Sequence, residues 1–98
     1  MQLKDFDFLS DSTEQTSTRF VTFITPGLAR FDLAIVTTNR FYGKKLVIDM
    51  QSGRSGVLAA DDLEEEGVIE ATFRIGEEEA KELSQFLYMV LGEVHFTD

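Results

Sequence analysis

The segment with the most chemical potential combines basic and aromatic residues, Arg40-Phe41-Tyr42-Gly43-Lys44-Lys45. Aromatic rings stack on nucleobases and basic groups contact phosphates, so the segment is a candidate binding patch. The candidate binding residues are Arg40, Phe41, Tyr42, Lys44 and Lys45. A simpler interpretation is a connection between strands, with one aromatic ring over the core edge and the lysines protecting the sheet. We favour the connection, because short basic and aromatic clusters are weak motifs.

A second segment of interest is the acidic run Asp61-Asp62-Leu63-Glu64-Glu65-Glu66. Carboxylate oxygens are the ligands that Mg²⁺ and Ca²⁺ prefer, but the run lacks the alternating ligands and central glycine of an EF-hand loop. Charge runs are usually solvent-exposed faces. We therefore assign no metal site, and the sequence leaves open whether this run binds a cation.

Residues that carry catalysis are scarce in this chain. It has no cysteine and a single histidine, His95, and the serines Ser52, Ser55 and Ser84 lie far from that histidine in sequence. The segment Gly53-Arg54-Ser55-Gly56 precedes no predicted helix, so it is not a phosphate-binding loop. Pairs of carboxylates are unspecific among eighteen acidic residues. We predict that the protein is not an enzyme and uses no cofactor.

Length and charge limit the classes of protein to which this chain can belong. Ninety-eight residues with 43% hydrophobic content predict one domain, residues 1–98, and a net charge of −9 argues against general binding to nucleic acid or to an anionic membrane. The charge is segregated: residues 1–16 carry −3, residues 17–60 carry +4 and residues 61–98 carry −10. No apolar run approaches the roughly 20 residues that span a bilayer, and the amino-terminal residues do not resemble a signal peptide. We expect a cytoplasmic protein.

Residues 17–74, which include the basic middle of the chain (residues 17–60), predict an antiparallel β-meander of four to five strands. Residues 19–25 are rich in β-branched and aromatic types and stop at Pro26-Gly27, where glycine would accept a positive φ. Further strands are expected around Phe31–Val36, in Leu46–Gln51 and, after a turn at Ser52-Gly53, in residues 54–60.

Three details of this meander can be checked in the structure. In the third strand, the alternation places Asp49 on the outward side with Val47 and Gln51, where Arg54 would pair with it across the strands. Residues 61–67 are predicted to form a loop or short helical turn. Residues 68–74 are predicted to form the fifth strand, with apolar side chains inward at Ile69, Ala71 and Phe73.

The acidic end of the chain predicts one amphipathic helix, residues 77–91. Its apolar residues recur at steps of three and four, at Ala80, Leu83, Leu87 and Val90. Glu77, Glu78 and Glu79 fall in the first turn, where the helix dipole favours carboxylates. Because this apolar stripe and the sheet each need a covering layer, the sequence predicts an α+β fold with the helix packed on one face of the sheet. Residues 1–16 form an acidic amino-terminal segment, and residues 93–98 form a tail.

Four segments carry a family resemblance: Thr18–Val21, Arg30–Val36, Arg40–Asp49 and Glu77–Ala80. The chain resembles a small family of cytosolic proteins of unknown function from low-GC Gram-positive bacteria. The resemblance covers about residues 17–91, and its most distinctive part is Arg-Phe-Tyr-Gly-Lys-Lys. The tail, Glu93–Asp98, does not match. The resemblance implies a free-standing cytosolic domain, and it transfers no activity or site.

These observations favour a non-catalytic protein-interaction or regulatory module that associates with itself, most simply as a dimer. Opposite charges on neighbouring segments and a sheet with open edges both suit a second copy or an unknown protein partner. The alternative is a nucleic-acid-associated protein that uses Arg40, Tyr42, Lys44 and Lys45 as a local basic patch, although the acidic total disfavours nucleic acid.

Overall fold

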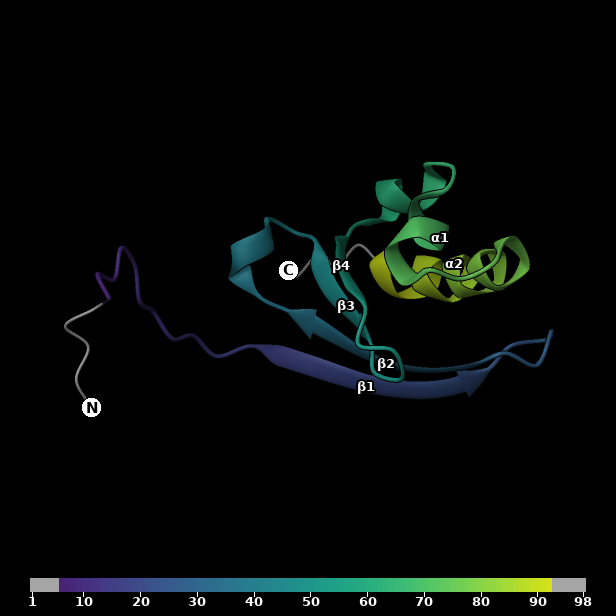
Figure 1. Cartoon of the computed structure of the whole chain (residues 1–98), viewed down its shortest axis with the longest axis horizontal. Helices are drawn as coiled ribbons and strands as arrows, with labels where there is room; N and C mark the ends of the chain where they lie inside the picture. Colours follow the sequence, from purple (N-terminus) through teal and green to yellow (C-terminus); the bar gives the residue numbers. More distant parts are fainter. Residues whose placement is uncertain (1–5, 93–98) are drawn as a thin grey trace, which may run out of the picture.

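The computed structural model describes residues 6–92, so His95 and the tail Glu93–Asp98 lie outside the described residues. In order, the elements are β1 (Ser17–Ile24), β2 (Arg30–Thr37), the 3-10 turn η1 (Asn39–Phe41), β3 (Lys45–Asp49), β4 (Ser55–Leu58), the 3-10 turn η2 (Ala60–Glu64), α1 (Val68–Phe73) and α2 (Glu77–Leu91). Within residues 6–92, four strands form one antiparallel sheet whose order follows the chain (Figure 1). The α+β meander predicted from sequence is confirmed.

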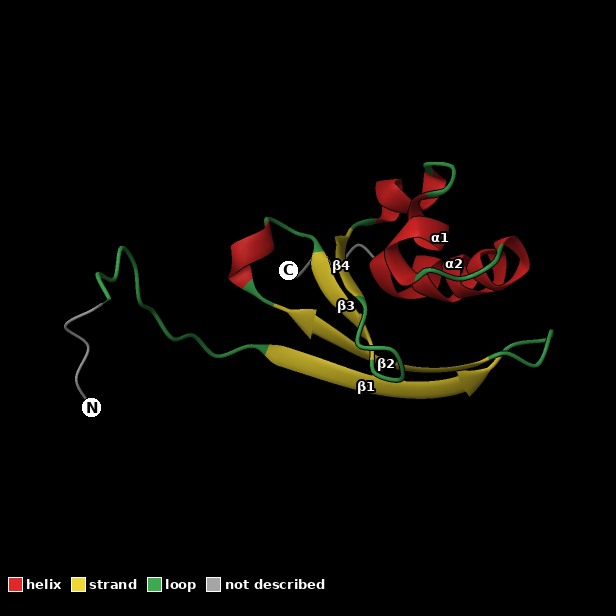
Figure 2. Cartoon of the chain, in the orientation of Figure 1, coloured by secondary structure: helices red, strands yellow, loops and turns green. Residues whose placement is uncertain are grey.

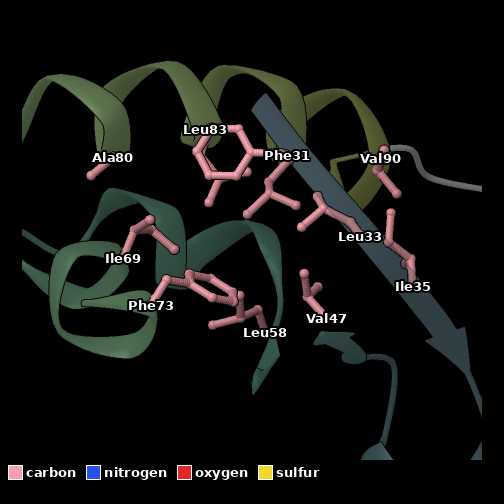
Figure 3. Close-up of a cluster of buried hydrophobic side chains, with 11 residues drawn as sticks. Phe31, Leu33, Ile35, Val47, Leu58, Ile69, Phe73, Ala80, Leu83 and Val90 are labelled. Atoms are coloured by element: carbon pink, nitrogen blue, oxygen red, sulfur yellow. The ribbon is translucent and has the colours of Figure 1, made fainter. Parts of the chain in front are cut away.

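The molecule has two layers, because both helices lie on the same side of the sheet (Figure 2). The core fills the space between the layers, and its buried side chains include Phe31 and Leu33 of β2, Phe73 of α1 and Leu83 of α2 (Figure 3). The sheet contributes one face to this core, and no helix of residues 6–92 lies on its other face.

The predicted carboxy-terminal helix is confirmed as α2. Its buried residues are the four that the apolar stripe predicts, Ala80, Leu83, Leu87 and Val90. Phe86 extends the stripe toward β1, where its ring stacks on that of Phe23 with a centroid distance of 4.3 Å. The periodicity therefore predicted both the helix and the face that it buries.

The hairpin between β1 and β2 turns at Pro26-Gly27, as predicted, but the left-handed residue is Leu28 (φ 70°) and not Gly27. The amide of Leu28 donates to the carbonyl of Thr25 at 2.8 Å and closes the turn. The amide of Gly27 donates to Glu82 Oε2 at 2.8 Å, which joins the hairpin tip to α2. The tip is therefore held against the helical layer.

The predicted fifth strand is wrong, because residues 68–73 form the short helix α1. Ile69 and Phe73 are buried, but Ala71, which the strand interpretation placed inward, is exposed. Apolar residues four apart lie on one face of both a helix and a strand, so Ile69 and Phe73 suit either structure. Gly67 (φ 82°) precedes the helix and Arg74 (φ 55°) ends it, and both conformations interrupt a strand.

The prediction that Asp49 faces outward toward Arg54 is also wrong. Val47 and Asp49 point to the helical layer and are buried, while the alternate residues Leu46 and Ile48 point to the other face. Asp49 caps its own turn: Oδ1 accepts from the amide of Gln51 at 3.1 Å, and Oδ2 accepts from the Ser52 hydroxyl at 2.8 Å. Paired with these local donors, the carboxylate is buried without an ionic partner.

Candidate functional site

The predicted basic and aromatic patch is a tight connection between β2 and β3. Thr38 begins η1 by accepting a hydrogen bond from the amide of Arg40 at its Oγ1. Tyr42 (φ 54°) and Gly43 (φ 91°) then reverse the chain in left-handed conformations. The structure brings the candidate residues into one loop, as the connection interpretation predicts.

The side chains of this loop do not form one common surface. Arg40 turns to the amino-terminal segment, where its Nε lies 3.7 Å from Glu14 Oε1 and its Nη2 donates to Ser12 Oγ at 3.2 Å. Lys44 turns to η2, where its Nζ lies 3.2 Å from Asp62 Oδ2. Two of the three cations are therefore paired with carboxylates of two different segments.

The other three candidate residues differ in exposure. Phe41 is half-buried, and Lys45, at the start of β3, is half-buried opposite Leu58 of β4. Tyr42 is 96% exposed, so its ring is free to contact a partner. Whether Arg40, Phe41, Tyr42, Lys44 and Lys45 bind a ligand stays a prediction.

Glu14 ties the amino-terminal segment to the sheet. The Thr38 hydroxyl donates to Glu14 Oε2 at 2.6 Å, and the amide of Asn39 donates to the same oxygen at 3.3 Å. The hydrogen bond from Thr38, the amide of Asn39 and the charge of Arg40 hold the pKa of the Glu14 carboxyl below its usual 4.5, although desolvation works in the opposite direction. The charged form of Glu14 is thus the one that the fold stabilises.

We expect the Thr38→Val variant to raise the pKa of Glu14 toward its usual value, because the variant loses the strongest of these hydrogen bonds. A carboxyl titration followed by NMR measures the pKa. Because folding lowers this pKa, its contribution to stability is present above the unfolded value and is lost as the pH falls through the folded value. Thr37→Val, at the neighbouring exposed position, is the matched control. Equal Glu14 pKa values in wild type and Thr38→Val would contradict the assignment.

The acidic run Asp61–Glu66 is split between structural contacts and a cavity. Asp62 Oδ2 accepts from the amide of Ala59 at 2.8 Å, and this bond together with Lys44 lowers the pKa of the Asp62 carboxyl against the effect of desolvation. Tyr88 of α2 donates to Glu64, and this contact raises the pKa of the Tyr88 hydroxyl. Within residues 6–92, no group of three or more histidine, cysteine or acidic side chains is arranged to hold a metal ion.

A cavity of about 390 Å³ lies between this segment and α2. Its acidic rim includes Glu65, Glu66, Glu70 and Glu77, with Lys81 as a basic group, and its apolar wall includes Ile69 and Ala80. Because most charged groups at the rim are carboxylates, the cavity is suited to cationic groups and not to phosphates.

The feature that the sequence interpretation missed is the uncovered side of the sheet, which we call the open face. Opposed residues in the strand register share a side, and these side chains therefore point away from the helices. The apolar residues of the open face are Phe20, Ile24, Ala34, Val36, Leu46, Ile48 and Val57, and the polar residues Thr18, Thr22, Arg30, Asp32 and Ser55 lie on the same side. Phe20 is 68% exposed and Ile24 is 65% exposed, both on the edge strand β1.

The sequence does contain a signal for the open face. In β3, Leu46, Val47 and Ile48 are all apolar, so the side chains on both faces of the strand are hydrophobic. In β1, Phe20 and Ile24 alternate with the apolar residues Val21 and Phe23, which pack on the core. Strands that are apolar on both sides are typical of sheets covered on both faces.

The family assignment follows from a profile comparison. A family profile described as SAV0927-like matches residues 9–89, which covers the sheet, α1, most of α2 and the loop at Arg40. The chain belongs to the SAV0927-like family. The resemblance to a family of unknown function is thereby confirmed, since this is a family of uncharacterised proteins. A comparison with curated proteins finds no match.

Membership of the SAV0927-like family assigns no substrate, partner or catalytic residue. In the part of the chain from residue 6 to residue 92, neither helix is long and apolar enough to cross a membrane.

Proposed function

We propose that this protein is a non-catalytic interaction or regulatory module of the cytoplasm that works by associating with a second copy of itself. The observation that supports the proposal is the open face, with Phe20 and Ile24 largely exposed on an edge strand. Large contiguous apolar patches are uncommon on monomeric proteins and mark interaction surfaces.

The presence of apolar residues on both faces of the strands supports the same function. Ala34 is buried and Val36, Leu46 and Ile48 are half-buried on the open face, although no helix lies over them. These strands are apolar on both sides, as strands of a doubly covered sheet are, while residues 6–92 supply one covering layer. A second copy would provide the missing layer, and two-fold dimers are the commonest assemblies.

Charge supports a protein partner over nucleic acid. Arg40 and Lys44 already form intramolecular ion pairs, which leaves less positive charge for a phosphate backbone. The open face itself carries a local pair, Arg30 with Asp32 at 3.5 Å. This neutral, apolar surface suits another protein surface.

Light scattering across a wide range of protein and salt concentrations measures this association. We expect a dimer whose dissociation constant rises by at least about 100-fold in Phe20→Lys, because a charge in the centre of an apolar interface is desolvated without a partner. Met89→Lys is the matched control, since Met89 is also 68% exposed but lies on α2. A wild-type protein that is monomeric at every concentration and salt would overturn the proposal.

A further inference from the structure

The amino-terminal residues 6–16, which we call the arm, carry apolar side chains that the rest of the described chain, up to residue 92, leaves largely exposed. Leu9 is 99% exposed, Phe6 is 68% exposed and Phe8 is 58% exposed. The arm leaves the sheet at the amino end of β1 and runs away from the helices (Figure 1). Exposed apolar side chains gathered in one segment are typical of a binding element.

The arm is fixed at its base in a way that directs it outward. Ser12 and Glu14 both contact Arg40, and Glu14 also accepts hydrogen bonds from Thr38 and Asn39. These contacts hold the base at the η1 end of the sheet, so residues 6–11 project from that end. The exposure of Phe6, Phe8 and Leu9, together with that of Phe20 and Ile24, shows that the arm does not cover the open face of its own copy.

Charge selects the side of a second copy that the arm would meet. The arm carries three acidic and no basic residues, a net charge of −3. Residues 17–58, which form the sheet and its loops, carry six basic and two acidic residues, a net charge of +4, whereas residues 59–92 carry ten acidic and two basic residues, a net charge of −8. The helical layer therefore repels the arm, whereas Arg30 and Asp32, the charged pair on the open face, offset each other and leave that face without net repulsion.

The dimensions of the arm suit the open face. Six extended residues, 6–11, reach about 20 Å, and Phe20 and Ile24 are separated by about 13 Å along β1. Phe6 and Phe8 are two residues apart, so they point to the same side of an extended segment. Their Cα atoms are about 7 Å apart in an extended segment, so both rings fit within the span between Phe20 and Ile24.

We infer that the arm of one copy covers the open face of a second copy, with Phe6 and Phe8 packed beside Phe20 and Ile24. This inference rests on the self-association proposed above and names the segment responsible for it. If the exchange is reciprocal, each copy contributes one arm and one open face, which gives a closed two-fold dimer.

The first test compares the full-length wild type with a triple variant, Phe6→Ser with Phe8→Ser and Leu9→Ser, by sedimentation velocity. We expect the dissociation constant of the dimer to rise by at least about 100-fold, because apolar anchors dominate interface energies. Met89→Ser, an equally exposed apolar position on α2, should leave the dissociation constant unchanged. A wild-type dimer that the triple variant does not weaken would overturn the arm inference while the proposed self-association stands; a wild-type monomer would overturn both.

The second test uses the absence of cysteine in this chain. Ser10→Cys, beside Leu9, is mixed with Thr22→Cys, which lies between Phe20 and Ile24 on the same side of β1. Mild oxidation should form a disulfide between the two different chains. Glu65→Cys, on the helical layer, replaces Thr22→Cys in the control mixture and should crosslink far less. Equal crosslinking in both mixtures would overturn the inference, whatever the stability of the variants.

Discussion

The Phe73→Ala variant will lose about 3–5 kcal/mol of unfolding free energy, a large share of the roughly 5–15 kcal/mol expected of a domain of this size. Phe73 is 1% exposed and is among the largest fully buried side chains. It lies on α1 and packs into the core with Ile69 and Leu58 (Figure 3). Removing the ring leaves a cavity between two layers that cannot close without moving the helix.

Urea denaturation at one fixed protein concentration measures this loss, so that association does not alter the comparison. Tyr42→Ala is the matched aromatic control, because the Tyr42 side chain is 96% exposed. Tyrosine and alanine both carry a Cβ atom, so the left-handed backbone at this position strains both residues similarly. We expect that control to change stability by no more than about 0.5 kcal/mol. Equal losses in the two variants would show that α1 is not part of the core.

The Gly56→Ala variant will destabilise the fold by about 1–3 kcal/mol through overpacking. A Cβ atom at position 56 would lie 2.7 Å from Cγ2 of Thr72, where β4 meets α1. Threonine is branched at Cβ and its χ1 is stiff, so the methyl group cannot move aside at low cost. The close approach of strand and helix therefore requires glycine here.

A double-mutant cycle isolates this contact. Thr72→Ser removes the methyl group and keeps the hydroxyl, so Gly56→Ala should cost much less in the Thr72→Ser background than in wild type. Urea denaturation of the four proteins gives the coupling energy. If Gly56→Ala lowers the free energy of unfolding equally in both backgrounds, the result would contradict the steric explanation. The loss would then come from the strand backbone.

The elements with one unambiguous period were predictable from local sequence. In α2, Ala80, Leu83, Leu87 and Val90 fit a helical face and no strand, and the structure buries all four. In β2, Phe31, Leu33 and Ile35 share one side of the strand, and all three are buried. Burial of these residues requires only that some apolar layer cover them.

The candidate site was less predictable, because its contacts join distant residues. Nothing near Arg40 in sequence indicates that Glu14 would neutralise it, or that Asp62 would pair with Lys44. The open face was missed for a related reason. Leu46, Val47 and Ile48 make both faces of β3 apolar, and composition alone does not say which face the helices cover.

Local patterning was therefore sufficient for the type of most elements, for the antiparallel meander and for the separation of a basic sheet from acidic helices. Packing decided the rest: Val47 and Asp49 face inward because β3 pairs with β2 in one register, and a one-residue shift would exchange the two faces. The sequence did not distinguish a helix from a strand over residues 68–73, because Ile69 and Phe73 reach the core in either structure. Packing decided in favour of the helix. Short-range periodicity specifies which residues share a side, and only long-range contacts select the side that is buried.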